Sequence, residues 1–255
     1  MKTVSRQTHF FLERKLVPVL LPIVLVCWLI THFNLWSLFA LWAFAVFGAN
    51  QLSIFGHRAW THRAWRPNKF LNTVGLFTHV ICLDGVPFAW CGTHRKHHRF
   101  SDTEQDPHSP RYRSNLSMIF APHAVVESSY YTDLLKDPSQ RWFSKYYWNI
   151  VAVWYFLLFV ISPELLFFWI AGQAAHRYEL YTALIYNHRD ANYTKSSNTI
   201  SMAYVFLNGE NWHANHHEDP RDWNFSKKWW QLDMGAWLIR FFVWAKLGKL
   251  TPRSV

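Results

Sequence analysis

The sequence contains few cysteines and no signal for removal of its N-terminus. The three cysteines, Cys27, Cys82 and Cys91, are odd in number and form no CxxC pair. A disulfide framework is therefore not indicated, and we expect free, buried thiols. The first 15 residues contain no short apolar core followed by a small-residue cleavage site. We expect the first apolar segment to stay in the protein and to act as its own insertion signal.

Charged residues are missing from two long stretches of the chain. No Lys, Arg, Asp or Glu occurs between Leu16 and Gly56, and Glu164 is the only one between Tyr146 and His176. The formal charge of +10 therefore comes from the N-terminal tail, the middle segment and the residues from Arg177 onward. This distribution is typical of a multispanning membrane protein with basic cytoplasmic segments. It argues against nucleic acid as a partner.

The apolar stretches are long enough for four transmembrane helices, since each span needs about 20 residues. We expect one turn at the polar Thr31–Asn34 and one at Ser162–Glu164, where Pro163 disfavours helix at the residue before it. The sequence predicts an all-α integral membrane protein, surrounded by lipid, with two helical hairpins, a helical cytosolic cap and both termini on the cytoplasmic side. In a single domain, 1–255, the expected spans are 16–31, 35–56, 147–162 and 165–187, and the cap covers 57–146 and 188–255.

Two segments of the predicted cap are also apolar. The segment from Leu71 to Trp90 contains a histidine, an aspartate, a glycine and a proline. We interpret it as a helix that lies on or dips into the membrane and not as a fifth span. The segment from Trp223 onward predicts an amphipathic interfacial helix. The many aromatic residues, Trp 16, Phe 21 and Tyr 11, fit interface belts and core packing.

Eight of the 15 histidines form three clusters. The sequences HRKHH at 94–98 and HANHH at 213–217 have the spacing i, i+3, i+4, which places three imidazoles on one face of a helix. In HRAWTH at 57–62 the two histidines are about 140° apart on an ideal helix. Both can then be ligands only if the helix ends or bends between them. The candidate ligands are His57, His62, His94, His97, His98, His213, His216 and His217.

Eight neutral nitrogen ligands exceed the roughly four of a single zinc site, which indicates two metal ions. Imidazole ligands alone suit Zn, Cu, Fe or Ni. A site where an apolar interior meets water, however, suits chemistry on a lipid chain, and breaking an unactivated C–H bond there needs an oxidant. Iron with O₂ provides one, whereas zinc has no redox chemistry. Of the seven other histidines, we interpret His9, His32, His79 and His123 as structural.

The three histidine boxes, in this order, resemble those of membrane fatty-acid desaturases of the acyl-CoA Δ9 (stearoyl-CoA) type. The segments DTEQDPHSP at 102–110, GENWH at 209–213 and KKWWQLDM at 227–234 support the resemblance, which covers roughly residues 51–250. It implies four transmembrane helices and a cytosolic cap with a di-iron centre held by histidines, so that the active site faces the cytoplasm. It also implies that O₂ and two electrons remove two vicinal hydrogens from a long-chain fatty acyl substrate, leaving a cis double bond.

The resemblance implies a ninth histidine ligand on the fourth span. We place it at His188, with His176, about three turns deeper, as the alternative. In the family, an Asn four residues before this ligand holds a metal-bound water. Here that position is Leu184, and Asn187 is adjacent to the histidine instead.

Other residues match the family's pattern one by one. Trp90 matches a tryptophan that shapes the bent acyl tunnel, and Arg95 matches a residue that contacts CoA, so we predict both as substrate-binding. Core packing and a solvated basic side chain are the respective alternatives. Glu104, Asp106 and Glu210 are candidate acceptors that orient ligand imidazoles, with surface salt bridges as the alternative. No basic pair for CoA phosphates is evident, which leaves CoA, a carrier protein or a lipid as the acyl carrier.

The sequence contains no HPGG-like haem-binding segment. We therefore expect electrons from a separate ferredoxin or cytochrome b5-like donor and its reductase, attracted by the basic cap. Two alternatives use the same iron site, a fatty-acyl hydroxylase and an acetylenase. A third alternative, from another class, is a non-catalytic membrane protein that binds zinc or bis-histidine haem.

Overall fold

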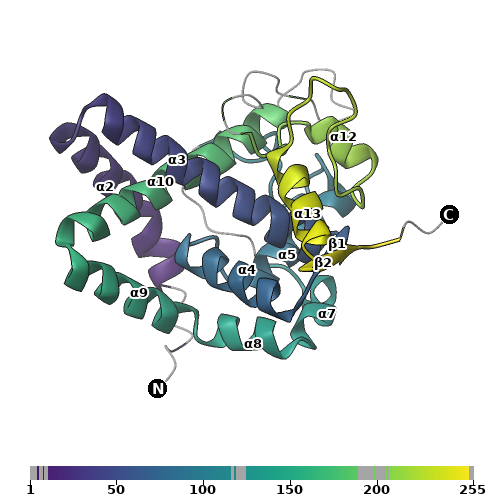
Figure 1. The fold of residues 1–255 in the computed structure, drawn as a ribbon, viewed down its shortest axis with the longest axis horizontal. Coiled ribbons are helices and arrows are strands. Elements are labelled where there is room, and N and C mark those ends of the chain that lie inside the picture. The colour runs from purple at the N-terminus through teal and green to yellow at the C-terminus, as the bar shows by residue number, and fades with distance from the viewer. Residues whose placement is uncertain are drawn as a thin grey trace.

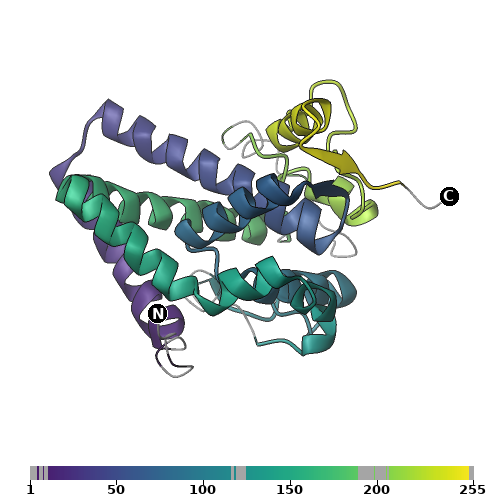
Figure 2. The ribbon, with the colours of Figure 1, turned by 60° about the horizontal axis from the view of Figure 1, so that its bottom comes forward.

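The computed structural model describes residues 5, 8, 11–115, 118, 125–188, 198, 205 and 207–252, and these are mostly helical. Four long helices form a bundle at one end of the molecule, and shorter elements gather at the other (Figures 1 and 2). The bundle consists of α2 (Val17–Thr31), α3 (Leu35–Gln51), α9 (Tyr147–Ile161) and α10 (Pro163–Asn187). The other helices are η1 (Leu12–Leu16), η2 (Leu52–Thr61), α4 (Lys69–Ile81), α5 (Pro87–Phe100), η3 (Ser128–Tyr130), α7 (Thr132–Leu135), α8 (Pro138–Lys145), α12 (His213–Glu218) and α13 (Met234–Trp244).

Helices occupy the four apolar ranges that the sequence singles out. Among the described residues, Leu12–Thr31 and Leu35–Thr61 are long and apolar enough to cross a membrane. Helices α8 and α9 meet this criterion only together, as a pair bent by 62°. Helix α10 is 25 residues long but carries Glu164, Arg177 and Glu179. The structure therefore contains two candidate spans by length and composition, or three with the bent pair.

The two hairpins turn at the same end of the bundle. The Asn34 side chain accepts a hydrogen bond from Ser37 N at 2.9 Å and caps the start of α3. Ser162 caps α10 in the same way through Glu164 N. His32 in the first turn and Glu164 in the second form an ion pair of 2.8 Å. The first turn thus lies beside the second, at the end of the bundle away from the cap (Figure 1).

Helix α10 is the centre of the bundle, because it packs against α2, α3 and α9. Its close approach to α3 depends on two glycines. A Cβ atom on Gly48 would lie 2.6 Å from the His176 ring, and one on Gly172 would lie 2.5 Å from the Phe44 ring. Both distances are too short for a side chain, so the bundle requires the absence of one at each position.

The segment from Leu71 to Trp90 forms parts of two helices, and the prediction of one helix across it was wrong. Helix α4 ends at Ile81, and α5 begins with Pro87 in its first turn, where the missing amide hydrogen costs nothing. The turn between them contains Leu83 at φ 61° and Gly85 at φ 90°. A continuous right-handed helix cannot contain residues with these positive φ angles.

The all-α prediction also missed a small sheet. Strand β1 (Trp65–Pro67) pairs antiparallel with β2 (Gly248–Leu250), so that the end of the chain lies beside the segment that follows η2. The expected helix from Trp223 onward is limited to α13. Asp233 caps its start by accepting from Ala236 N, and Lys246 just beyond its end has φ 60°.

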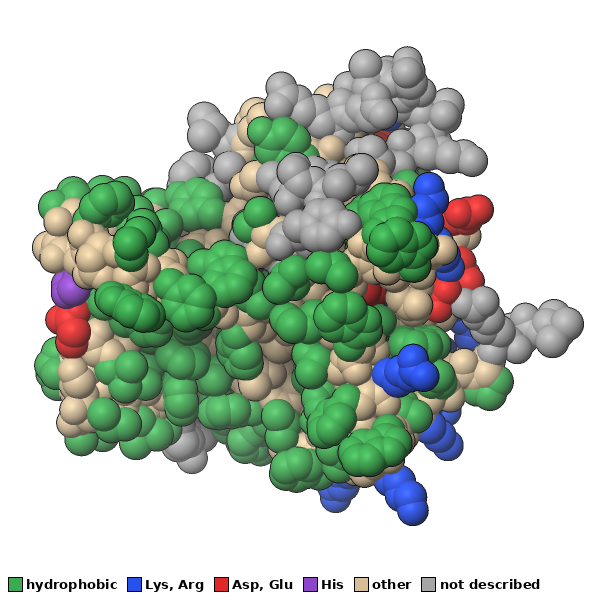
Figure 3. Space-filling view, turned by 45° about the horizontal axis from the view of Figure 1, so that its top comes forward, with side chains coloured by type: hydrophobic (Ala, Val, Ile, Leu, Met, Phe, Trp, Pro, Cys, Tyr) green, Lys and Arg blue, Asp and Glu red, His purple; other side chains and the backbone are tan. Residues whose placement is uncertain are grey.

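Large apolar side chains are exposed along α2, α3 and α9. Ile30, Trp36 and Ile161 each expose more than 70% of their surface. One face of the molecule is covered with such side chains, whereas Lys and Arg side chains gather toward the cap end (Figure 3). An apolar patch of this extent marks a surface that is covered by lipid or protein.

Candidate metal centre

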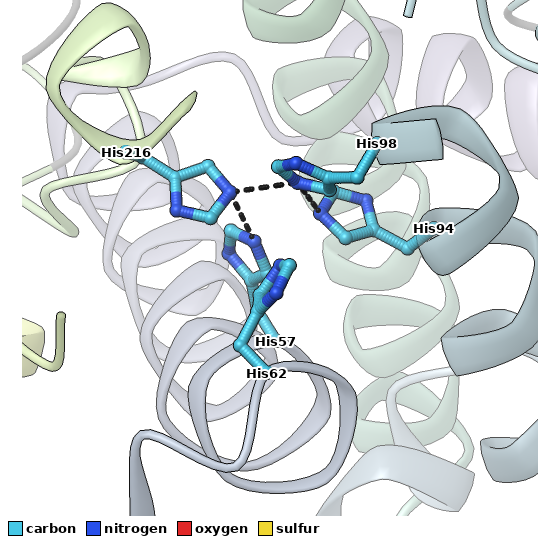
Figure 4. Close-up of side chains that lie close together, drawn as sticks. All are labelled: His57, His62, His94, His98 and His216. Atoms are coloured by element: carbon cyan, nitrogen blue, oxygen red, sulfur yellow. Dashed lines mark hydrogen bonds between the residues drawn. The ribbon is translucent and has the colours of Figure 1, made fainter. Parts of the chain in front are cut away.

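The structure brings nine histidines together in two groups between α5, η2, α12 and the end of α10. Within each group, one ring nitrogen of every histidine lies within 4.8 Å of the others. The side chains of the first group point toward one another from three elements (Figure 4). The first group is His57, His62, His94, His98 and His216, and the second is His97, His188, His213 and His217.

The boxes HRKHH and HANHH divide between the two groups. His94 and His98 belong to the first group and His97 to the second, whereas His213 and His217 belong to the second and His216 to the first. The reason is geometric. The histidines at i and i+4 are about 40° apart around the helix axis, whereas the histidine at i+3 is turned in the opposite direction from the first. The rings of His98 and His217 stack at 4.4 Å between centroids. The two groups are therefore adjacent.

His57 and His62 are brought together by a change of helix type. The segment Leu52–Thr61 is a π-helix, and His62 N donates to His57 O at 3.1 Å. A helix that bonds each residue to the fifth places residues five apart almost above one another. The two rings are 4.9 Å apart between centroids. The sequence predicts a break or bend here, but the helix widens instead and ends only at His62.

The structure separates the two candidates for the ninth histidine. His188 follows the last residue of α10, and its Nε2 lies 2.8 Å from His213 Nε2 in the second group. His176 lies deeper in the bundle, with Nε2 2.8 Å from Asp84 Oδ1. Asn187, beside His188, donates to Glu210 O at 3.3 Å.

Carboxylates lie behind three of the clustered imidazoles and hold their Nδ1 atoms. Among the candidates from sequence, Asp106 and Glu210 make such contacts, whereas Glu104 is exposed. The third carboxylate, Asp102, was missed, although it opens the same DTEQDPH motif. The pairs are His97 with Asp106 at 2.8 Å, His188 with Asp102 at 3.1 Å, and His57 with Glu210 at 2.6 Å.

These contacts fix which ring nitrogen can bind a metal ion. A carboxylate beside Nδ1 accepts a hydrogen bond from Nδ1–H. The ring hydrogen therefore stays on Nδ1, and Nε2 keeps a bare lone pair. His97 Nε2 lies 3.4 Å from His217 Nε2, and His57 Nε2 lies 3.0 Å from His216 Nε2. A ring nitrogen at this distance from a bare lone pair either carries a hydrogen or shares a metal ion with it. The donor set therefore fits a metal ion in each group.

Seven of the clustered imidazoles have lowered pKa values, which favours the neutral form that a metal ligand needs. Burial, and then repulsion between neighbouring imidazoles, lowers the pKa of His217 to about 2. Burial also lowers the pKa of His188, although its hydrogen bond to Asp102 opposes this. The same two causes lower the pKa of five others well below the usual value, namely His62, His94, His98, His213 and His216.

A cavity lies against both histidine groups. His57 and His94 of the first group and His213 of the second form part of its wall. Much of the rest is apolar and comes from α3, η2 and α10, with Ala49, Leu52, Leu180, Ala183 and Leu184. Trp90 also lines the cavity, and its ring stacks on the His94 ring at 5.1 Å. The structure thus places Trp90 beside His94 on the cavity wall.

Arg95 is engaged with the protein itself. Its guanidinium donates to the carbonyl oxygens of Trp60, Thr61 and Tyr130 and, through two nitrogens, to the Asp133 carboxylate. Burial raises the pKa of Asp133, but hydrogen bonds from Arg95 and Arg63 outweigh it and lower that pKa to about 2. Arg95 therefore connects the end of η2 with the segment that contains Tyr130 and Asp133. Its contact with an acyl carrier stays a prediction, and it would require the guanidinium to leave these acceptors.

Comparison with known proteins places this geometry in a family. The model of the family described as "Fatty acid desaturase" matches residues 34–244. The chain belongs to the fatty acid desaturase family. The family predicted from the three boxes is thus confirmed, and with the two apolar helices it makes this chain a membrane protein.

Several similar proteins are Δ9-type desaturases. Delta-9 acyl-lipid desaturase 2 of Arabidopsis thaliana is 28% identical over 81% of this chain and 72% of its own length. Delta-9 desaturase-like 3 protein of the same plant is 27% identical over 94% and 88%. Acyl-CoA 5-desaturase AL21 of Anemone leveillei is 29% identical over 80% and 68%. These similarities support fatty-acyl desaturation as the activity.

Proposed function

We propose that the chain is an O₂-dependent fatty-acyl desaturase that introduces a cis double bond into a saturated acyl chain. The observation that carries the proposal is the pair of histidine groups at the wall of an apolar cavity. The histidines provide metal ligands and the cavity provides space for hydrocarbon, so the two requirements of the reaction meet at one place.

The nine clustered histidines are the proposed ligands of two iron ions, one held by each group. Bound iron would supply the power to activate O₂ and to break an unactivated C–H bond, which zinc lacks. Asp102, Asp106 and Glu210 hold Nδ1 of three ligands and so fix the direction of Nε2. No protein side chain is required to act as a separate acid or base at the reacting carbons.

The cavity has the task of selecting the reacting carbons. Neighbouring methylene groups are chemically alike, so position relative to the metal centre decides which of them react. Small side chains at Ala49 and Ala183 leave space, and Trp90 bounds the cavity next to His94. The saturated chain would lie between α3 and α10 and exclude water from the site.

We further propose a four-span arrangement with both termini and the metal centre on the cytoplasmic side. The hairpins α2–α3 and α9–α10 turn side by side, and the ion pair of His32 with Glu164 lies at the far end. Helix α10 can cross a membrane in spite of its charges because Glu179 is buried against other helices. The basic residues of the cap then lie on the cytoplasmic side.

The acyl carrier and the electron donor are partners that bind the cap. The relatives named above include an acyl-lipid and an acyl-CoA desaturase, so lipid and CoA both remain candidate carriers. Electrons would come from a ferredoxin or cytochrome b5-like protein and its reductase. Basic side chains on the cap would attract such an acidic donor.

Expression in a host with saturated membrane lipids tests the proposal. Mass spectrometry of the acyl chains should show an alkene that depends on O₂. The variant His216→Ala should abolish the alkene and lower bound iron, whereas His32→Ala, in the far hairpin turn, should retain both. An alcohol or an alkyne as the main product would show that the activity is hydroxylation or acetylenation instead of desaturation. A protein that binds two irons but forms no product would refute the proposal.

A further inference from the structure

Helix α10 carries two buried titratable side chains, His176 and Glu179, and Asp84 of the turn between α4 and α5 lies beside His176; neither histidine group includes them. His176 lies between two carboxyl groups, since its Nε2 is 2.8 Å from Asp84 Oδ1 and its Nδ1 is 3.7 Å from Glu179 Oε2. The three residues expose 5% of their surface or less. Burying three titratable side chains so completely costs free energy, which calls for a function that this group of residues could serve.

The inner end of this line faces the cavity. Glu179 lines the cavity together with His57, His94 and His213. Its Oε1 accepts a hydrogen bond from Asn208 at 3.2 Å, but its Oε2 and the facing His176 Nδ1 have no hydrogen-bond partner among the residues that the structure describes. A small rotation of either side chain would close the 3.7 Å between them to a hydrogen bond.

The outer end of the line lies beside a second pocket. Asp84 stands in the turn between α4 and α5, and its neighbours Leu83 and Gly85 line this pocket with Glu13 and Arg177. Around Asp84, the Gln51 side chain donates to Oδ2, and His79 Nδ1 lies 3.7 Å from the same atom. The line from Glu179 through His176 to Asp84 therefore runs from the cavity to the turn whose residues Leu83 and Gly85 line the second pocket.

The charges of the three groups leave one proton to be shared. Two carboxylates beside one imidazolium would leave an uncompensated charge in a buried site. The least costly state pairs the imidazolium with Asp84, the nearer carboxylate, and keeps a proton on Glu179. A proton given up by Glu179 can then be replaced from His176.

We propose that Asp84, His176 and Glu179 form a proton path from the second pocket to the cavity, with Glu179 as the last donor. The proposal rests on the proposed function, because desaturation consumes protons. O₂, two electrons from the separate donor, two protons and two hydrogen atoms from neighbouring methylenes give one alkene and two waters. Both oxygen atoms are reduced to water, and the acyl chain is oxidised by two electrons. The two protons must reach this site, and Glu179 places a carboxyl group on the cavity wall.

Turnover of matched variants gives the first test. The change Glu179→Gln keeps the hydrogen bond with Asn208 but removes the acidic proton that Glu179 can transfer. Turnover should therefore fall by about 10²-fold. Iron per chain and substrate affinity should stay at wild-type values. The control Glu164→Gln changes a carboxylate at the other end of the same helix and should leave turnover unchanged. Wild-type turnover in Glu179→Gln, or loss of its iron, would overturn the path.

Infrared spectroscopy of the metal-free protein gives a second test that is independent of activity. The wild type should show a carboxylic acid band that shifts in D₂O, and Glu179→Gln should lack it. In His176→Asn the band should remain but exchange more slowly. Absence of a Glu179 band, or equal exchange in both proteins, would overturn the path. A wild type that makes no alkene would refute the proposed function, and the infrared result would still decide the path.

Discussion

At the scale of single residues, the proposed metal centre contains carboxylates beside the Nδ1 atoms of three histidines. Asp106 accepts from His97 Nδ1 and also from the backbone amides of Asp102 and His108, so one side chain orders both a ligand and its loop. An orienting carboxylate of this kind typically contributes 10- to 100-fold, by order of magnitude, to metal affinity.

The neighbouring acidic residue provides a control for this role. In Asp106→Asn, an amide NH₂ would face one of the three donors, so we expect metal affinity to fall about 10- to 100-fold. Glu104→Gln changes an exposed side chain two positions earlier and should leave affinity unchanged. Metal titration of the metal-free variants measures both. Equal affinity in the two variants would show that Asp106 does not orient a ligand.

The clustered imidazoles also predict how stability depends on pH. Burial lowers the pKa of His94, His213 and His216 in the folded protein, whereas the unfolded chain takes up protons near pH 6.5. Protons therefore bind preferentially to the unfolded state, and metal-free protein should lose stability as the pH falls below about 6.5. Bound metal should move this loss to lower pH. Thermal unfolding measured against pH, with and without metal, checks this, and a Tm of the metal-free protein that rises on acidification would contradict it.

The sequence predicted which histidines lie close together but not how they are arranged, and their role as metal ligands stays a prediction. The spacing i, i+3, i+4 identified the histidines of two boxes but not their division between two groups, because that depends on how α5 and α12 face each other. Asp102 was missed since its φ of 59° and its contact with His188 arise only when the end of α10 reaches the loop. Arg95 matches the family's pattern, but its contacts with Asp133 depend on the packing of the cap.

At the scale of elements, the π-helix η2 is held in place by one buried arginine. Arg58 is fully buried and pairs with Asp233 at 3.0 Å. It also donates to the carbonyl oxygens of Trp223 and Asn208. Asp233 in turn caps α13, so a single ion pair connects η2, the loop before α12 and α13.

The repeated motif HRAW allows a matched test of this connection. Arg58→Met would leave Asp233 buried without its partner, and we expect a loss of about 3–5 kcal/mol of unfolding free energy. Arg63 occupies the equivalent position five residues later, but its side chain is 54% exposed in its pair with Asp133. Arg63→Met should therefore cost about 1 kcal/mol or less. Denaturant unfolding in detergent measures both, and similar losses would refute the role of Arg58.

Sequence periodicity predicted the long helices but not the local departures from them. Apolar runs identified α2, α3, α9 and α10, because a bilayer-length helix leaves a clear pattern. The widening of η2 and the turn at Leu83 and Gly85 depend on tertiary contacts that no periodicity shows. The same holds for strands β1 and β2, since their pairing joins segments far apart in the chain.

At the scale of the whole molecule, the proposed function requires a polar end that carries the catalytic site and an opposite end that lies on the other side of the membrane. The hairpin turns carry His32 and Glu164, and the cap carries the two histidine groups at the opposite end of α10. In the proposed topology these two ends lie on opposite sides of the bilayer.

Labelling of introduced cysteines tests this topology. After replacement of the three native cysteines by serine, Phe33→Cys lies in the first hairpin turn, where Phe33 is 75% exposed. Glu104→Cys lies in the cap. A membrane-impermeant maleimide should label Phe33→Cys only from outside and Glu104→Cys only after the cytoplasmic side is opened. Labelling of both from one side would contradict the four-span arrangement.

The central claim is that two histidine groups hold two iron ions, and the metal content of the purified active protein tests it most directly. Elemental analysis should find two irons per chain, and the loss of one group's ion in a variant such as His213→Ala should leave fewer irons and no alkene. One iron per chain, zinc alone, or the absorption band of a haem would contradict the account.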